Sequence, residues 1–320
     1  MKAISLYTLL MGLALMCAFP VLSDEVLVVG TWNIEDLPRS NHQERAKKIQ
    51  AIAYLVAQYD IDILALQEVT HDEKNGFVPI QSELIPRLGG RDKFGYVVSS
   101  MGASDRLAYV YNKERVMVSC NWEGNACVAE LKEIALPGQG ENRPALVLDV
   151  NKGDEETDFD FTILNIHAES GRTESATLKR AQQFRLLGEW ILHELVENQY
   201  WRNAQDQDWD LLLVGDYNEF CDTGEDEDGS RLDLLETLLK FSPAGDSTVV
   251  LSDDWAIDHI AMTKLRGGAL EELESGPEVI RLYEESAFCS IFGTCTAASF
   301  NEEISDHLPV IAAFRNHDAD

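Results

Sequence analysis

The segment 211–220, LLLVGDYNEF, constrains the fold more than any other stretch because an apolar run there leads directly into polar residues. Its first four residues have the composition of a strand buried on both faces, and Gly215 allows the backbone to turn. Asp216 and Asn218 are two residues apart, so an extended backbone would project both side chains to one side. A carboxylate beside an amide can hold a water molecule or an oxyanion. Both residue types are also common in turns, so an ordinary turn remains the alternative at this point.

The rest of the chain predicts a layered α/β fold. Apolar and β-branched runs predict further strands at 26–31, 61–66, 95–99, 107–112, 145–151, 158–166, 258–262 and 308–314. Apolar stripes at helical spacing predict helices after residue 40 and at 81–88, 174–196 and 231–240. We expect Ser40 and Gln43 to form the capping box of the first helix. A strand, a helix and a strand in succession indicate layered α/β architecture.

Polar residues that can do chemistry stand at the ends of several predicted strands. They are Asn33, Glu68, His167, Asp216 with Asn218, Asp258, and Asp306 with His307. Each one alone is explained equally well by a turn, a capped strand or a hydrogen-bonded core histidine. Layered sheets gather functional residues at strand ends, however, and this set contains what metal-assisted cleavage of a phosphate ester requires.

The segments that carry these residues resemble the motifs of the endonuclease/exonuclease/phosphatase superfamily, typified by deoxyribonuclease I. In chain order they are TWNIE, LALQEV, LNIHAES, VGDYNEF, IDHI and SDHLPV, between Gly30 and Val310. The resemblance implies a four-layer α/β sandwich, in which helices flank two packed mixed β-sheets. It also implies hydrolysis of a phosphodiester or phosphomonoester that depends on a divalent ion.

The resemblance further implies a metal site. Glu68 is similar to the metal-binding glutamate of the family, and Asn33 and Asp306 would help to hold the ion, with Asn33 also near the substrate. Oxygen ligands of this kind suit Mg²⁺ or Mn²⁺. Arg143 matches a phosphate-contacting arginine. The acidic loop 222–230 could hold a structural Ca²⁺, although a solvated loop explains it more simply.

The same resemblance implies catalytic roles for five residues. Asp216 and Asn218 match the pair that orients the attacking water and the transition-state oxygens. His167 and His307 match the two histidines that flank the scissile phosphate, where imidazoles suit proton transfer near neutral pH. Asp258 matches the carboxylate that fixes the orientation of the second histidine.

Three positions differ from the family pattern. Asp105 stands where deoxyribonuclease I has a glutamate that orients the first histidine, so we expect this shorter carboxylate beside His167. Glu169 replaces a lysine that many bacterial relatives have, which predicts weaker contact with a long nucleic acid. Cys221 matches a disulfide cysteine, but its partner position is Trp255, so the bridge of the family is not expected.

Residues 1–23 predict a secretory signal peptide, because Lys2 precedes the apolar run 9–19 and a small residue precedes Asp24. A membrane anchor would need a longer apolar run. We therefore expect one domain at 24–320, secreted to the periplasm or the extracellular space, with no transmembrane segment after cleavage.

Export would permit disulfides, and two close cysteine pairs are present, Cys120 with Cys127 and Cys289 with Cys295. Their connectivity stays open. The chain has 56 acidic and 26 basic residues, for a formal net charge of −30. Such a surface repels nucleic acid at long range, so a phosphate-bearing substrate requires local cations at the site.

The leading hypothesis is a secreted, monomeric, metal-dependent phosphodiesterase without a stable protein partner, whose favoured substrate is DNA. One alternative is a phospholipid hydrolase similar to a sphingomyelinase, or a hydrolase of small phosphoesters. In the lipid version, Phe288, Ile291 and Phe292 could touch a membrane. A third hypothesis is a binding module without catalysis, which predicts gaps in the catalytic set.

Overall fold

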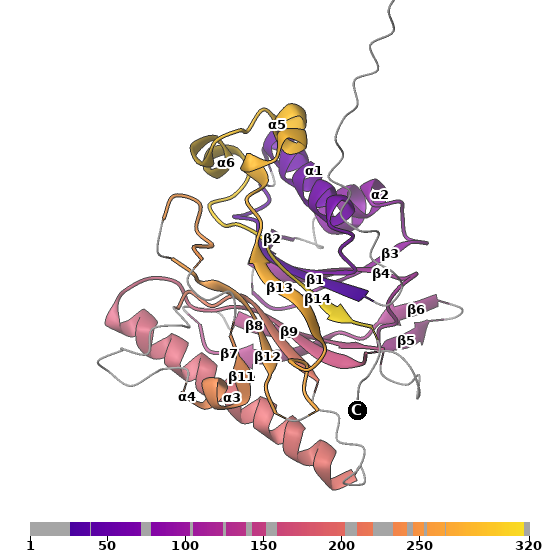
Figure 1. The fold of residues 1–320 in the computed structure, drawn as a ribbon, viewed down its shortest axis with the longest axis vertical. Helices are drawn as coiled ribbons and strands as arrows, with labels where there is room; N and C mark the ends of the chain where they lie inside the picture. The colour runs from indigo at the N-terminus through magenta and orange to yellow at the C-terminus, as the bar shows by residue number, and fades with distance from the viewer. Residues whose placement is uncertain are drawn as a thin grey trace, which may run out of the picture.

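Two six-stranded β-sheets form the centre of the molecule (Figure 1). The computed structural model describes residues 26–38, 40–71, 78–102, 105–123, 126–138, 143–151, 159–201, 210–219, 233–241, 246–252, 255–265 and 267–316. The first sheet contains, in spatial order, β13 (Leu273–Val279), β14 (Val310–Arg315), β1 (Val26–Asn33), β2 (Ile63–Thr70), β4 (Asp105–Asn112) and β3 (Phe94–Val98). The second contains β11 (Leu239–Lys240), β12 (Asp258–Thr263), β10 (Leu211–Asp216), β9 (Phe161–His167), β8 (Arg143–Val150) and β7 (Lys132–Leu136). A separate two-stranded sheet pairs β5 (Cys120–Glu123) with β6 (Ala126–Ala129).

Helices cover the outer face of each sheet, which confirms the predicted four-layer α/β sandwich (Figure 1). The first sheet is covered by α1 (His42–Gln58), η2 (Ile80–Leu84), α2 (Ile85–Arg87), η3 (Leu282–Glu284), α5 (Ser286–Phe292) and α6 (Ala297–Glu303). The second sheet is covered by α3 (Glu174–Trp201) and α4 (Asp233–Leu238). Within the described ranges, no helix has both the length and the apolar character of a membrane span.

Alternation along the central strands explains why their sequences are apolar at almost every position. In β1, Leu27 and Val29 belong to the core between the two sheets, whereas Val28 belongs to the core under the helices. Leu212 and Leu213 of β10 divide in the same way between the inner core and the core under α3. A strand that is buried on both faces has no polar side, so its apolar run is continuous.

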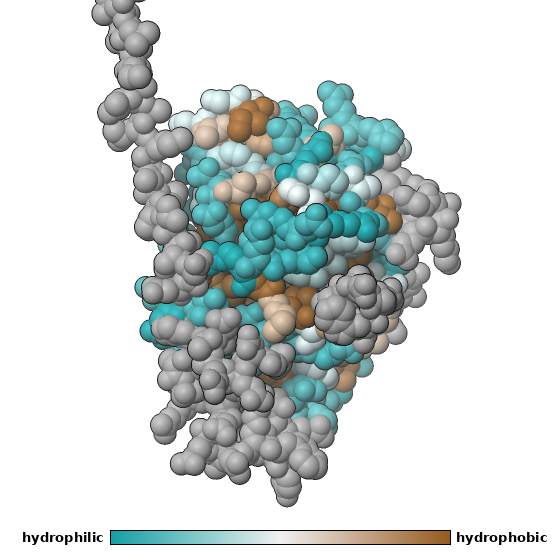
Figure 2. Space-filling model, turned by 90° about the vertical axis from the view of Figure 1, so that its right-hand side faces the viewer, coloured by the Kyte–Doolittle hydropathy of each residue, from teal (hydrophilic) through white to brown (hydrophobic). Residues whose placement is uncertain are grey.

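The surface between the apolar areas is hydrophilic. On the face in Figure 2, hydrophilic residues form a band across the described surface, and separate apolar areas lie above and below it. This distribution agrees with the excess of acidic residues in the sequence.

The first helix begins differently from the prediction. Ser40 and Gln43 do not form its cap; instead Asn41 is the N-cap, and its side chain accepts a hydrogen bond from the Glu44 amide at 3.2 Å. The Asn41 amide group in turn donates to the Glu44 carboxylate at 2.7 Å. Both pairs have the same spacing, and asparagine caps a helix as well as serine does, so sequence spacing alone did not separate them.

Residues 264–304 contain elements that the sequence pattern did not indicate. β13 pairs with β14 through two register shifts, and most of its residues are not buried, so it lacks a clean alternation. Cys289 and Cys295 are free thiols, so the local bridge that their spacing allowed is not formed. Phe288 and Phe292 are buried in the core beneath α1, at 0% and 8% exposure.

Some predictions fall outside the described residues. These are the signal peptide at 1–23, the calcium-binding alternative at 222–230 and the state of Cys221. Cys120 is disulfide-bonded. The side chains of Cys127 and Arg143 are also outside, so the partner of Cys120 and the phosphate contact of Arg143 stay predictions.

Gly215 is required at the turn out of β10, and its replacement gives a first prediction. Its φ is +130°, and an added Cβ would lie 2.0 Å from the Ile166 carbonyl oxygen of the neighbouring strand. We expect Gly215→Ala to lower the free energy of unfolding by at least about 2 kcal/mol. Urea denaturation measures this change. Gly90→Ala is the matched control, because Gly90 has φ +93° and open space around it, so only the backbone cost of about 1 kcal/mol is expected. Equal losses of unfolding free energy in the two variants would contradict a steric clash at Gly215.

Candidate active site

Strand ends from both sheets meet at one edge of the sandwich. The strands β1 and β2 are parallel, as are β9 and β10, so each pair carries its final residues to the same edge. The strand β12 runs antiparallel to β10 and begins beside its end, where Asp216 pairs with Asp258. The polar residues brought together are Asn33, Glu68, Asp105, His167, Asp216, Asn218, Asp258, Asp306 and His307.

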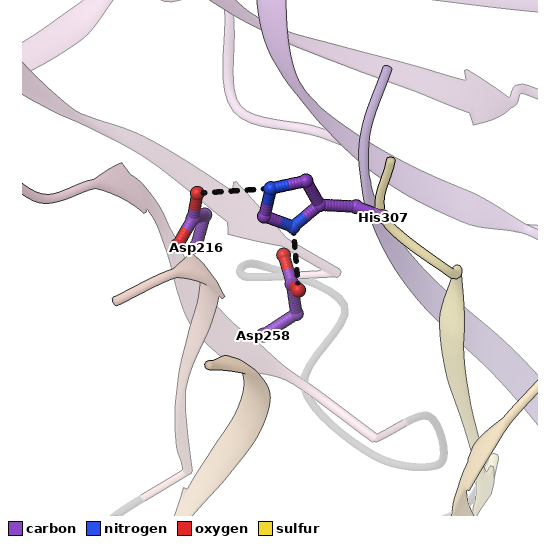
Figure 3. Close-up of side chains that lie close together, drawn as sticks. All are labelled: Asp216, Asp258 and His307. Carbon is purple, nitrogen blue, oxygen red and sulfur yellow. Dashed lines mark hydrogen bonds and ion pairs between the residues drawn. The ribbon is translucent and has the colours of Figure 1, made fainter. Parts of the chain in front are cut away.

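A buried triad lies at the centre of this site (Figure 3). His307 Nδ1 donates to Asp258 Oδ2 at 2.8 Å, and His307 Nε2 lies 3.8 Å from Asp216 Oδ2. The two carboxylates therefore lie on opposite sides of one imidazole. All three side chains are buried, so water screens their charges only weakly.

The electrostatics of the triad favour a proton on the imidazole. Burial alone would lower the pKa of His307, but Asp258 and then Asp216 raise that pKa well above its usual value. Burial raises the pKa of Asp216 to about 7, with the charge of His307 lowering it and that of Asp258 raising it. A carboxylate whose pKa lies near neutrality can both accept and release a proton at physiological pH.

The second histidine also lies close to Asp216. His167 Nε2 is 3.5 Å from Asp216 Oδ2, the same oxygen that His307 approaches, and 3.7 Å from Glu68 Oε1. His167 Nδ1 is 3.6 Å from Asp105 Oδ2, so the shorter carboxylate does lie beside the first histidine. Asp216 is thus placed between two imidazoles.

Asn33 connects the triad to a group of carboxylates. Its side-chain amide donates to Glu68 Oε1 at 2.9 Å and to Asp216 Oδ2 at 3.1 Å. Its oxygen accepts from the Glu35 amide at 3.0 Å, and the Glu35 carboxylate accepts from the Asp306 amide at 3.1 Å. Glu35 stands in the TWNIE motif but is not among the site residues predicted from the sequence; its place two residues after Asn33 is the available signal.

The donor chemistry of this group fits a hard divalent cation. Burial raises the pKa of Glu35, and the charges of Asp306 and Glu68 raise it further, while Lys48 opposes them. Three neighbouring carboxylates with the Asn33 oxygen form the ligand type that Mg²⁺ and Mn²⁺ prefer. Asp306 is 42% exposed, which leaves room for the water ligands that Mg²⁺ keeps.

The buried triad is a second geometric candidate for an ion, because ligand atoms of Asp216, Asp258 and His307 lie within 4.8 Å of one another. We consider it the weaker candidate. An ion there would compete with the proton that the two carboxylates hold on His307, and the burial of all three residues leaves little space for water ligands.

The backbone of the site is held in unusual conformations. Glu35, Glu68 and Asn218 have φ values of 49°, 56° and 50°, in the left-handed region. The extended geometry that we expected after Gly215 therefore does not persist, and the turn alternative holds for the backbone. The Asn218 amide nevertheless donates to Asp216 Oδ1 at 2.8 Å, which keeps the two residues together. Such conformations cost energy and often occur at functional sites.

Supporting residues that spacing could not reveal hold the histidine segment. Ser305 Oγ donates to the Asn33 carbonyl at 2.8 Å, and the Trp32 indole donates to the His307 carbonyl at 3.0 Å. Thr248 Oγ1 accepts from the Asp258 amide at 3.0 Å, and its carbonyl accepts from the Leu308 amide at 2.7 Å. These bonds fix the His307 segment against both sheets.

A buried amide pair joins the sheets beneath the site. Gln67 Nε2 donates to Asn165 Oδ1 at 2.8 Å, and Asn165 Nδ2 donates to the Leu66 carbonyl at 3.0 Å. Breaking a buried hydrogen bond between side-chain amides leaves their polar groups without a partner and without water. The pair therefore fixes β2 relative to β9, and with them Glu68 relative to His167.

Comparison with known proteins identifies the family of the chain. The model of the Endonuclease/Exonuclease/phosphatase family matches residues 30–307, which hold every residue of the site. The chain belongs to the endonuclease/exonuclease/phosphatase family. Members of this family hydrolyse phosphoesters. A comparison with curated proteins finds no match.

Solved structures of the endonuclease/exonuclease/phosphatase fold resemble the chain at low sequence identity. TDP2 of D. rerio, complexed with a single-strand DNA product, matches 92% of this chain and 100% of its own at 14% identity and TM-score 0.57. The human Nocturnin catalytic domain, with a bound sulfate anion, matches 91% and 95% at 15% identity and TM-score 0.54. A mannosyl-6-phosphatase of Bacteroides thetaiotaomicron matches 89% and 98% at 16% identity and TM-score 0.51. Likeness at this level of identity establishes the fold alone.

Proposed function

We propose that the protein is a divalent-metal-dependent phosphodiesterase that hydrolyses DNA by attack of water on the scissile phosphate. The observation that carries this proposal is one carboxylate oxygen, Asp216 Oδ2, which lies 3.5 Å from His167 Nε2 and 3.8 Å from His307 Nε2. Asn33 donates to the same oxygen at 3.1 Å and so joins it to Glu68. Two imidazoles and an amide that also bonds to Glu68 thus converge on one carboxylate oxygen, which can accept a proton.

Glu68, Asn33, Asp306 and Glu35 would hold Mg²⁺ or Mn²⁺, because they supply the carboxylate and amide oxygens of the site. When bound, the ion would offset negative charge on the phosphate oxygens. This local charge matters because the chain carries a formal −30.

The side chains would carry the proton transfers. Asp216, whose pKa burial raises to about 7, accepts the proton of the attacking water as its oxygen bonds to phosphorus. The backbone N–H of Asn218 donates to Asp216 Oδ1 at 2.8 Å and so fixes that carboxylate. When the bond from phosphorus to the leaving oxygen breaks, that oxygen takes a proton from one of the flanking imidazoles, His167 or His307. Asp258 holds His307 in position for this role through the 2.8 Å hydrogen bond.

Degradation of plasmid DNA tests the proposal. We expect purified protein to nick and then degrade supercoiled plasmid in Mg²⁺, and we expect EDTA and His167→Ala each to abolish this activity. Gel electrophoresis over a time course measures it, and readdition of excess Mg²⁺ to the EDTA sample controls for damage by the chelator. Cleavage that persists in EDTA would contradict the metal-dependent mechanism.

The alternatives are separated by the same assay with other substrates. The lipid alternative has lost much of its support, because Phe288 is fully buried and only Ile291 of the three expected membrane residues is exposed, at 54%. Small phosphoesters remain the second candidate, since the strongly acidic composition favours a compact substrate over a long polyanion. Glu169 is 3% exposed, so its carboxylate does not lie on the surface that a substrate would contact. Activity on a sugar phosphate with none on DNA would favour this second candidate.

We also propose that the protein is exported, with cleavage before Asp24, on the strength of the N-terminal sequence pattern. The intact mass of protein recovered from the periplasm or the medium of an expressing bacterium tests this proposal. A mass that includes residues 1–23 would contradict it.

A further inference from the structure

Arg172 and Trp255 form a contact between two loops at the edge of the active site. The guanidinium carbon of Arg172 lies 4.1 Å from the centre of the Trp255 ring system. Arg172 follows His167, the last residue of β9, by five positions, and Trp255 precedes Asp258, the first residue of β12, by three.

The sheet topology places this contact over the end of β10. The strand β10 lies between β9 and β12 in the second sheet. The loop that leaves β9 and the loop that enters β12 therefore flank the end of β10, where Asp216 pairs with His167 on one side and with Asp258 on the other. The Arg172–Trp255 contact therefore lies at the same edge of the second sheet as Asp216, the proposed catalytic carboxylate.

Both loops are held by hydrogen bonds to neighbouring segments. Arg180 of α3 donates to the carbonyls of Glu169 and Gly171 at 2.9 and 2.7 Å, and its ion pair with Glu219 at 3.0 Å adds the segment after β10. On the other side, the Trp255 carbonyl accepts from the amide of Thr248, the same residue that supports Asp258. Arg180 and Thr248 thus hold the loops of the guanidinium and the indole, and Thr248 also supports Asp258 of the proposed catalytic set.

The contact is exposed and contributes little to stability. Trp255 is 38% exposed and Arg172 is exposed. A cation–π contact at an exposed site adds little to the free energy of unfolding, so its loss would not unfold the domain. A fixed indole beside a positive charge is, in contrast, well suited to bind a ligand that has a planar ring and a phosphate.

We propose that Arg172 and Trp255 form a nucleotide-binding platform, on which a base next to the scissile phosphate stacks on the indole and a neighbouring phosphate pairs with the guanidinium. This inference rests on the proposed nuclease function and narrows its substrate to strands that carry bases. Stacking of a base on an aromatic side chain is worth about 1–3 kcal/mol, or about a 5- to 150-fold change in affinity. The Arg172 cation also offsets the net negative charge of the chain at the point where a polyanion would arrive.

The test compares two short single strands of equal length and backbone charge. One is built from thymidine nucleotides and the other from base-free tetrahydrofuran units. We expect Trp255→Ala to lower kcat/KM on the thymidine strand by about 5- to 150-fold and to leave the base-free strand unchanged. Trp255→Phe should restore most of the activity. Leu251→Ala is the matched control, because Leu251 is an exposed apolar residue shortly before Trp255 in the chain, at 63% exposure.

Binding measurements test the nucleotide-binding platform independently of the nuclease proposal. Titration with the uncleaved thymidine strand in EDTA should quench more tryptophan fluorescence in the wild type than in Trp255→Phe, and Arg172→Gln should weaken binding of both strands. A wild-type protein that cleaves neither strand contradicts the nuclease proposal, and the quenching difference still decides the platform. Equal quenching in the two proteins would overturn the platform. If the wild type cleaves the thymidine strand, equal cleavage of it by Trp255→Ala, or equal losses on both strands, would also overturn the platform.

Discussion

Replacing His307 with alanine is expected to lower kcat/KM for DNA by at least about 1000-fold. His307 is held by Asp258 at 2.8 Å and faces Asp216 at 3.8 Å, so its removal takes away a proton donor and leaves two buried carboxylates facing each other. The loss should appear mainly in kcat, because the imidazole interacts most strongly with charge that develops in the transition state. Steady-state kinetics on an oligonucleotide measures the effect.

His193→Ala is the matched control, because His193 lies exposed on α3, on the outer face of the second sheet. It should retain wild-type kinetics. Circular dichroism and thermal unfolding establish that His307→Ala is folded before its activity is compared. A folded His307→Ala protein within about tenfold of the wild type would exclude this residue from the chemistry.

Replacing Glu68 with glutamine is expected to weaken Mn²⁺ binding and DNA cleavage by at least about 100-fold each. Glutamine keeps the shape of the side chain but removes the charge that attracts the ion. It also disturbs the bond in which Glu68 Oε1 accepts from the Asn33 amide at 2.9 Å. Isothermal titration with Mn²⁺ measures the affinity without any need for turnover.

Glu189→Gln controls for the loss of one carboxylate from a chain of formal charge −30. Glu189 lies on α3 and its side chain is 55% exposed. It should leave the Mn²⁺ affinity unchanged. An unaltered affinity in Glu68→Gln would instead direct attention to the buried triad of Asp216, Asp258 and His307 as the cation site.

The sequence was informative where strands are buried on both faces. Val28 and Val29 point to different cores, and the resulting continuous apolar run is visible without any structure. β13 was invisible for the opposite reason, because its exposed residues and two register shifts remove any regular alternation. The first helix cap was missed by one residue, since Ser40 and Asn41 are chemically equivalent starts for a helix.

Within the site, the residues that sequence reasoning found stand directly at strand ends, as Asn33, His167 and Asp216 do. The supports were not visible because they act through hydrogen bonds between segments far apart in the chain. Ser305 bonds to a carbonyl 272 positions away, and Arg180 reaches the loop after β9 from a helix. Local spacing carries no information about such partners, and only the fold brings them together.

The central claim is that a cation and two imidazoles seat a phosphate on an otherwise anionic protein. Anomalous diffraction from crystals soaked with Mn²⁺ and inorganic phosphate tests it most directly. We predict a single strong peak about 2.1 Å from a Glu68 oxygen and close to Asn33 and Asp306, with phosphate between His167 and His307. Manganese bound away from Glu68, or phosphate that contacts neither histidine, would contradict the claim.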